Sequence, residues 1–142
     1  MKAVAIDLDG ALGDTRPLFE AWLEDASRKL RADLGGGAEA VLDERLGNWR
    51  PLLERFAEEH AAVYLRPRGQ ANAVLRKLQA AGVRLGAFTG TPEPLARVAL
   101  AQLGAARHVD VLECGDGALD RLLATLGEET VVVRSLPDLT AA

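Results

Sequence analysis

The sequence predicts an α/β protein built on a doubly wound parallel sheet, with a helical segment inserted directly after the first strand. From residue 67 onward, short apolar runs alternate with amphipathic helical spacing, as a sheet with crossover helices requires. Between residues 15 and 66, in contrast, the apolar residues recur only at helical spacing. At 142 residues the chain is long enough for one core with a small inserted subdomain, but not for two full domains.

The first strand is expected at residues 2–8, a short apolar run that is followed by Gly10. A continuous run of this length suits a central parallel strand that is buried on both faces. The helical segment 15–66 is interrupted by a glycine triplet at 35–37 and again by Gly47. Because glycines punctuate helical patterns, we expect three helices in this segment.

Strands and helices are then expected to alternate. Pro92 suits the first turn of a helix, and Gly82, Gly104 and Gly127 each follow a helical segment as an end signal. Four strands with crossover helices result. The expected order is a helix at 69–81, a strand at 83–88, a helix at 92–103, a strand at 109–112, a helix at 118–126 and a strand at 130–133.

The composition is that of a globular protein and excludes several classes of partner. Apolar residues make up 49% and charged residues 27% of the chain, a balance that argues against disorder. The net charge of -4 gives no attraction to nucleic acid or to anionic membrane surfaces, and no apolar stretch approaches a membrane span. Cys114 is the only cysteine, and the first residues lack the pattern of a signal peptide. We therefore expect a cytoplasmic protein without nucleic acid or membrane partners.

Two carboxylates follow the first strand directly. Asp7 and Asp9 stand at its carboxyl end, where open α/β sheets bind their ligands. With one residue between them their side chains point in different directions, so one can attack a phosphorus atom while the other protonates the leaving oxygen. Gly10 permits a tight turn that exposes backbone amides to a phosphoryl oxygen. An Asp-x-Asp-Gly sequence also makes plain turns, so its surroundings decide its interpretation.

These surroundings resemble a known motif. The string from Asp7 to Thr15, D-L-D-G-A-L-G-D-T, resembles the first motif of haloacid dehalogenase-type phosphatases, D-x-D-G-T-L-x-D-[ST], with Ala11 in place of the usual threonine. The resemblance covers essentially the whole chain and indicates the phosphoglycolate phosphatase-like branch. The division of the chain that it implies is a Rossmann-like α/β core at 1–14 and 67–142, with a small helical cap at 15–66 inserted in it.

The second motif of the family is a serine or threonine at the end of the second strand, and Thr89 matches it. The resemblance implies that Thr89, Gly90 and Gly10 bind the phosphoryl group. A hydroxyl and the neighbouring backbone amides can hold a phosphoryl oxygen as it gains charge, and the following helix adds its N-terminal dipole. The other interpretation is a helix N-cap, for which Thr89 and Thr91 are equally suited.

Two features of the family are missing from the sequence. The family carries a lysine after the third strand, whereas this chain has no lysine beyond Lys77. The nearby cations are Arg97, Arg107 and Arg121, and each is also explained as a solvated charge. The family carries a Gly-Asp pair after the fourth strand, where this chain has Arg134 alone. A guanidinium at that point repels a divalent cation instead of binding it.

The resemblance nevertheless implies a cofactor, Mg2+, held by Asp7, Asp9 and Asp138, the last being the second acidic position after the fourth strand. Asp138 can equally be a surface residue of the C-terminal turn. A rival alignment takes the segment after the third strand as the metal motif, with Asp116 and Asp120 facing Asp7. That alignment must remove one strand and one helix from the order of elements in the family.

Two functions remain open. The first is a phosphatase for a small phosphorylated metabolite, in which Asp7 forms an aspartyl-phosphate and Asp9 protonates the leaving alcohol. The second is a catalytically inactive protein with this fold and a binding or regulatory role, in which Arg134 pairs with Asp7 or Asp9 in place of the metal. A receiver domain fits the long insertion poorly, and Asp9 disfavours dehalogenation. The sequence leaves the substrate and the oligomeric state open.

Overall fold

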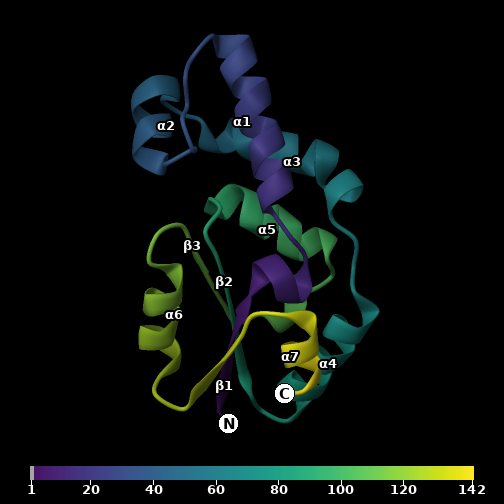
Figure 1. Ribbon diagram of the computed structural model, residues 1–142. Helices are drawn as coiled ribbons and strands as arrows, with labels where there is room; N and C mark the ends of the chain where they lie inside the picture. Colours follow the sequence, from purple (N-terminus) through teal and green to yellow (C-terminus); the bar gives the residue numbers. More distant parts are fainter. Residues whose placement is uncertain (1) are drawn as a thin grey trace.

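A parallel sheet forms the centre of the molecule. The computed structural model describes residues 2–142, and within them the sheet has the strand order β3-β2-β1-β4 (Figure 1). All neighbouring strands are parallel, so their carboxyl ends lie at one edge, and the expected α/β class is confirmed. The strands are β1 (Ala3–Asp7), β2 (Arg84–Thr89), β3 (Val111–Cys114) and β4 (Thr130–Val133).

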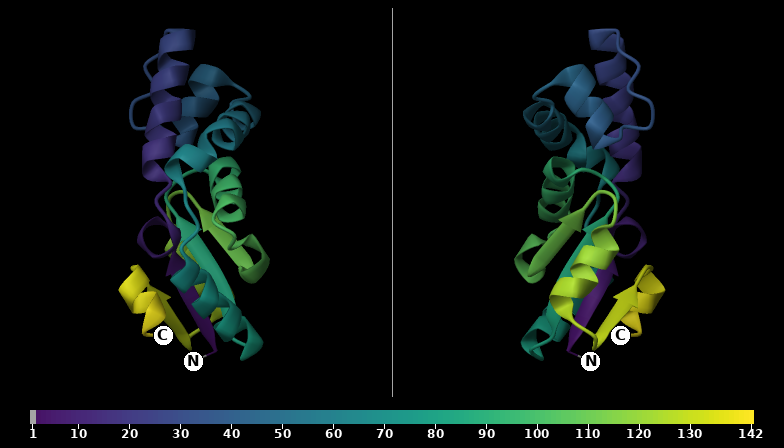
Figure 2. Two further views of the ribbon diagram at one scale, coloured as in Figure 1. Left: turned by 90° about the vertical axis from the view of Figure 1, so that its right-hand side faces the viewer. Right: turned by 90° about the vertical axis from the view of Figure 1, so that its left-hand side faces the viewer.

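The central position of β1 follows from its apolar residues. Ala3, Val4, Ala5 and Ile6 are all buried, as expected for a strand that is covered on both faces. Helix α6 covers one face of the sheet, and α4 and α5 cover the other (Figure 2). The helices after residue 67 are α4 (Gly69–Ala80), α5 (Glu93–Gln102), α6 (Ala118–Leu126) and α7 (Leu136–Thr140).

The elements expected after residue 67 all form, with their ends shifted by at most two residues. The largest shift is that of β3, which begins at Val111. A short 3-10 helix, η2 (Ala106–His108), precedes it, and the Leu85 amide donates to the Asp110 carboxylate at 2.9 Å instead of to a backbone carbonyl of β3. Strand β3 therefore starts two residues later than expected. Helix α7 was not expected, because its five residues are too few to show a periodic pattern.

Three helices lie within residues 15–66, as expected, and we call these residues the helical block. Trp22, Leu42 and Trp49 are buried in it. The block also packs on the rest of the molecule, since α3 lies along α5 and one apolar cluster runs from the block into the sheet (Figure 1). A role of the block as a substrate cap stays a prediction. Its helices are α1 (Arg16–Leu30), α2 (Glu39–Leu46) and α3 (Arg50–Tyr64).

None of the helices formed by residues 2–142 combines the length and the apolar character needed to cross a membrane.

Candidate active site at the acidic loop

The acidic loop, residues 7–15, follows β1 and turns back tightly. The Gly13 amide donates to the Leu8 carbonyl at 3.0 Å, a wider spacing than that of an α-helical turn. Gly10 has a φ of 132°, and a Cβ at this position would collide with the carbonyl oxygen of Arg134. The Gly10 amide donates to the Gly13 carbonyl at 2.7 Å. Gly10 therefore supplies the expected turn, but its amide is not free for a phosphoryl oxygen in this arrangement.

The Asp7 carboxylate lies at the carboxyl end of the central strand and is partly exposed. Its Oδ1 accepts the Asp9 amide at 3.1 Å, and its Oδ2 lies 3.8 Å from Arg134 Nη1. Burial and the negative charge of Asp9 raise the pKa of Asp7 above its ordinary value of 3.8, although the Asp9 amide, Arg134 and Arg16 oppose this rise. The positive charges near Asp7 therefore offset only part of the rise in its pKa that burial and the neighbouring Asp9 carboxylate cause.

Threonines from two distant segments hold the Asp9 carboxylate. Asp9 Oδ1 accepts both the amide and the hydroxyl of Thr15 at 2.7 Å, and Oδ2 accepts the Thr89 hydroxyl at 2.6 Å. The Thr91 hydroxyl lies 2.8 Å from that of Thr15 and 3.1 Å from that of Thr89. All three threonines are buried, so these hydrogen bonds are shielded from water. We call Asp9 and these three residues the threonine network.

Thr89 therefore lies beside Asp9, at the end of β2. Neither Thr89 nor Thr91 caps α5, because the N-cap residue is Pro92 and it makes no side-chain capping bond, so the N-cap interpretation is wrong. Sequence reasoning did not assign Thr15 or Thr91 to the site. The only signal for Thr15 is its place as the last residue of the first motif.

Gly90 is exposed and faces a cavity of about 350 Å³. The segment 37–40 of the helical block lines the same cavity, together with Gly115 and Asp116 from the loop after β3. The space above the carboxyl end of β2 is therefore open to a small ligand. Phosphate binding by Thr89 and Gly90 stays a prediction.

Three arginines surround the acidic loop. Arg134 directly follows β4. Arg68 Nη1 donates to the Gly10 carbonyl at 2.7 Å, and Arg16 Nε donates to the Asp14 carboxylate at 2.8 Å. Of these three, sequence reasoning singled out Arg134 alone. The only signal for Arg68 was its place in the segment that returns from the helical block to the core.

The arginines considered as replacements for the lysine of the family are engaged elsewhere. Arg97 pairs with Glu93 at 2.6 Å, and Arg121 pairs with Glu113 at 3.0 Å. Arg107 lies in η2, which precedes β3 and is therefore at the edge of the sheet opposite to the acidic loop. None of the three supplies positive charge to the acidic loop through these contacts.

The acidic residues do not gather into the magnesium site that the resemblance implies. Asp138 is exposed in α7, where its amide donates to Ser135 Oγ at 3.2 Å. Within residues 2–142, no group of three or more His, Cys, Asp or Glu is arranged to hold a metal ion. Both oxygens of Asp9 accept hydrogen bonds from hydroxyls, and the Arg134 cation lies beside Asp7. Mg2+ is usually held by one or two carboxylates together with waters and substrate oxygens. Here the Asp9 carboxylate is engaged and a cation lies beside the other carboxylate, Asp7, so these side chains do not fit Mg2+.

The strand order corrects the rival alignment. That alignment needs the loop after β3 to face Asp7, but β2 separates β3 from β1. Strand β4 pairs with β1 directly, with Val133 opposite Ile6, so Arg134 comes level with Asp7. Asp116 instead lies exposed at the far side of β2.

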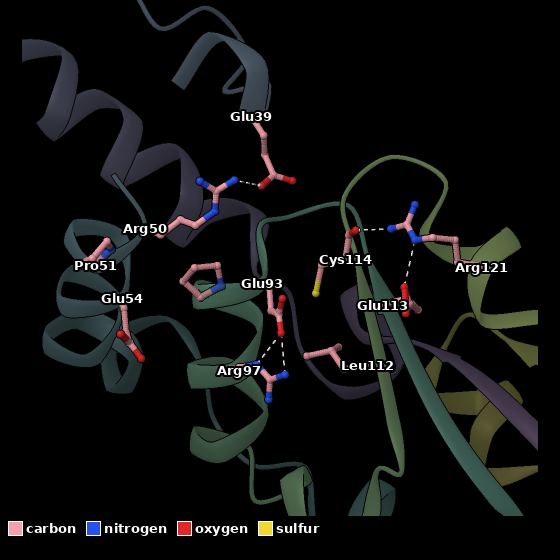
Figure 3. Close-up of a pocket in the computed structure, with 11 residues that line it drawn as sticks. Glu39, Arg50, Pro51, Glu54, Glu93, Arg97, Leu112, Glu113, Cys114 and Arg121 are labelled. Atoms are coloured by element: carbon pink, nitrogen blue, oxygen red, sulfur yellow. Dashed lines mark hydrogen bonds and ion pairs between the residues drawn. The ribbon is translucent and has the colours of Figure 1, made fainter. Parts of the chain in front are cut away.

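A cavity of about 670 Å³ lies beside β3, between α5 and the helical block (Figure 3). Arg50, Arg97 and Arg121 line it, and each forms an ion pair with a glutamate. Cys114 points into the cavity (Figure 3), and burial raises the pKa of its thiol to about 12. The thiol therefore stays protonated at neutral pH and is not a reactive nucleophile.

Comparison with known proteins finds similar hydrolases. A family model described as haloacid dehalogenase-like hydrolase matches residues 1–118. An N-acetylmuramic acid 6-phosphate phosphatase of Pseudomonas aeruginosa is 32% identical over 136 residues, which cover 82% of this chain and 60% of the relative. A phosphoglycolate phosphatase of Neisseria meningitidis is 30% identical over 139 residues, covering 82% of this chain and 59% of the relative. The chain thus spans less than two thirds of the length of these two curated relatives.

Solved structures share the fold. CbbY from Rhodobacter sphaeroides, in complex with phosphate, superposes with a TM-score of 0.64 at 21% identity, covering 93% of this chain and 76% of that one. Protein Tyrosine Kinase A of Mycobacterium tuberculosis superposes with a TM-score of 0.51 at 26% identity, covering 99% of this chain and 78% of that one. Because proteins named for different activities share this fold, the chemistry must be argued from the site.

Proposed function

Because the chain belongs to the haloacid dehalogenase-like hydrolase family, we propose that it is a phosphatase whose nucleophile is Asp7. The observation that carries this proposal is the position of Asp7 at the carboxyl end of the central strand, level with Phe88 and therefore next to Thr89. A small phosphomonoester would bind there with its phosphoryl group at Asp7. The two curated relatives are named for phosphorylated acids, so these compounds are the first candidates for the substrate.

Two carboxylates divide the reaction between them. Asp7 Oδ2 attacks the phosphorus atom and forms an aspartyl-phosphate, while the bond from phosphorus to the alcohol oxygen breaks. Asp9, in its protonated form, gives its proton to that oxygen, so the alcohol leaves neutral. A water molecule then attacks the same phosphorus atom, Asp9 takes a proton from it, and phosphate leaves with Asp7 restored.

Asp9 must leave part of the threonine network to reach the leaving oxygen. Its Oδ2 accepts the Thr89 hydroxyl at 2.6 Å in the structure. A rotation that breaks this bond frees the Asp9 carboxyl and also frees the Thr89 hydroxyl to donate to a phosphoryl oxygen. The Gly90 amide, at the same strand end, is the second donor in this proposal.

Phosphatases of this family generally use Mg2+. Since the donor set at the acidic loop does not fit that ion, no step above is assigned to a metal. Within residues 2–142, the positive charge that lies within 4.0 Å of Asp7 is the guanidinium of Arg134.

We assign the choice of substrate to the helical block. Its segment 37–40 lines the cavity that Gly90 faces, so the leaving alcohol would lie against this segment. Residues 15–66 would then act as the cap that the sequence predicts.

The test is the release of phosphate from phosphoglycolate, N-acetylmuramic acid 6-phosphate and p-nitrophenyl phosphate, each measured with and without added Mg2+. Asp7→Asn should lower kcat/KM by about 100-fold or more, because the amide is a poor nucleophile. The matched control is Asp120→Asn, which changes an exposed carboxylate of α6 that does not line the cavity faced by Gly90 and should keep the activity. A wild-type rate no higher than that of Asp7→Asn would refute the phosphatase.

The second candidate is a protein of this fold that binds a phosphorylated ligand without turnover. Arg134 beside Asp7 is compatible with both functions, because a guanidinium can pair with the carboxylate or donate to a phosphoryl oxygen. The two functions differ in the assay: ligand binding without phosphate release, on every compound tested, would support the second candidate.

A further inference from the structure

The phosphoryl group of a monoester carries two negative charges, and the acidic loop adds two carboxylates to them. Something must balance this charge, and the donor set does not fit a divalent cation. We propose that Arg134 takes the place of the metal, so that the acidic loop binds a phosphoryl dianion in the absence of any divalent cation. This inference rests on the proposed function, because it assumes the same phosphoryl position beside Asp7.

The sheet, rather than the side chain, fixes where Arg134 stands. Val133 lies opposite Ile6 in the parallel ladder between β4 and β1, so the next residues on the two strands, Arg134 and Asp7, come level with each other. Neighbouring strands are about 4.8 Å apart. The carbonyl oxygen of Arg134 also occupies the space that a Cβ on Gly10 would need. The backbone of Arg134 is therefore held directly beside the acidic loop, and its guanidinium lies near Asp7.

The donors of Arg134 are free to take an additional acceptor. Its Nη1 lies 3.8 Å from Asp7 Oδ2, which is too long for a hydrogen bond. Within residues 2–142, Asp7 is the only acidic residue that lies within 4.0 Å of the Arg134 guanidinium. The Arg134 side chain is 60% exposed. The guanidinium lies 5.6 Å from the centre of the Phe88 ring, which gives it an apolar face to rest on. A phosphoryl oxygen that enters between Arg134 and Asp7 would meet unused N–H groups.

The chemistry of a guanidinium matches this task and excludes the ion. It has no lone pair to offer a metal, and its charge repels Mg2+ from the adjacent Asp7. Its planar fork can donate two parallel hydrogen bonds to a phosphoryl group. Two further arginines bring positive charge to the acidic loop: Arg68 donates to the Gly10 carbonyl, and Arg16 donates to the Asp14 carboxylate. Asp9 is meanwhile held by hydroxyl and amide donors, which spread its negative charge.

The first experiment titrates the purified chain with inorganic phosphate by calorimetry, once in EDTA and once in Mg2+. The wild-type Kd should be the same within about twofold in both, because one guanidinium carries the charge in both conditions. Binding that appears only with Mg2+ would overturn the inference, and so would no measurable binding in either condition.

Variants then assign the effect to Arg134. In EDTA, Arg134→Gln should weaken phosphate binding by about tenfold or more, a typical loss for one charge-assisted hydrogen bond. The matched control is Arg97→Gln, another exposed arginine in an ion pair, which should leave the Kd unchanged. Because the Arg134 side chain is largely exposed, Arg134→Gln should fold normally, and far-UV circular dichroism checks this. An unchanged Kd in folded Arg134→Gln would overturn the inference.

A third variant tests the metal position itself. Arg134→Asp places a carboxylate beside Asp7 and should create Mg2+ binding, measured by calorimetry with the metal alone, that the wild type lacks. If Arg134→Asp does not bind Mg2+, the inference that Arg134 occupies the position of the metal is overturned. The inference and the proposed function fail separately: metal-free binding without phosphate release refutes only the phosphatase, whereas strictly Mg2+-dependent binding and release refute only the inference.

Discussion

At the scale of single residues, His108 is the one buried side chain of residues 2–142 with a nitrogen or oxygen atom that lacks a hydrogen-bond partner. Its Nδ1 donates to Gln79 Oε1 at 2.7 Å, whereas its Nε2 has no partner. Burial, followed by the positive charges of Arg107 and Arg76, lowers the pKa of His108 below its ordinary value of 6.5. The folded protein therefore keeps His108 neutral at a pH at which the unfolded chain protonates it.

This difference makes the stability depend on pH. Since the unfolded chain binds the extra proton, the contribution of His108 is fully present above pH 6.5 and is lost as the pH falls below it. The slope should not exceed about 1.4 kcal/mol per pH unit for this one proton. Urea unfolding at several pH values between 5.5 and 7.5 measures it. His108→Gln should make the free energy of unfolding depend less on pH, whereas His60→Gln should leave this dependence unchanged. The same pH dependence in both variants would contradict the assignment to His108.

The site residues differ in how well the sequence predicts them. Asp7 and Thr89 are predictable because each ends a buried strand, and the carboxyl ends of parallel strands meet at one edge. The hydrogen bonds from Thr15 and Thr91 to the rest of the threonine network are not, because a hydroxyl carries no pattern that names its acceptor. The engagement of the Gly10 amide depends on the exact turn, which the residue types alone do not determine.

At the scale of elements, α6 approaches the sheet most closely where β2 has no side chain. A Cβ on Gly86 would lie 2.5 Å from Leu122 Cδ1 and 3.0 Å from Leu126 Cδ1. Leu122 is fully buried and cannot swing into solvent. Gly86 thus sets the distance between α6 and the face of the sheet that it covers.

Gly86→Ala should therefore lower the free energy of unfolding by about 1–3 kcal/mol through overpacking. Gly69→Ala is the matched control, because nothing lies within 4 Å of a Cβ at that position. Combining Gly86→Ala with Leu122→Val should cost less than the sum of the two single changes, since the shorter side chain makes room. Chemical denaturation measures all four variants, and strict additivity would show that the two residues do not share one space.

The sequence predicts long elements better than short ones. Apolar runs and glycine end signals locate the strands and α4, α5 and α6 to within two residues. Helix α7, with five residues, and the wide turn at Leu8–Leu12 have no period to detect, because both are stabilised by local hydrogen bonds rather than by an apolar face.

At the scale of the whole molecule, one apolar cluster joins the helical block to the sheet. It includes Leu53 and Ala57 of α3 together with Leu95 and Ala99 of α5. Both tryptophans, Trp22 and Trp49, lie in the block and are buried. Their fluorescence therefore reports on the block, whereas far-UV circular dichroism reports on the helices of the entire chain.

The two signals should change together in urea, with one midpoint, because a shared core makes unfolding cooperative. A tryptophan transition at lower urea would contradict this and would show that the block unfolds by itself. Trp22→Phe provides the control for the assignment of the signal, since it leaves Trp49 as the single reporter in the block.

Strand order is the property of the whole molecule that the sequence could not decide. Two segments, one after β3 and one after β4, could be aligned with the same acidic motif of the family. The local sequence pattern predicts where each strand begins and ends, but not which strands pair with each other. Because β4 pairs with β1, Arg134 rather than Asp116 lies beside Asp7.

The contacts around the acidic loop also bear on when the site forms. Arg68 and Thr89 reach Gly10 and Asp9 across 58 and 80 positions of the chain, and the backbone of Arg134 meets Gly10 across still more. Such long-range contacts form late in folding, because the intervening chain must first be ordered. On the ribosome, the acidic loop is synthesised more than 100 residues before β4 is complete, yet its final geometry must wait until β4 has emerged.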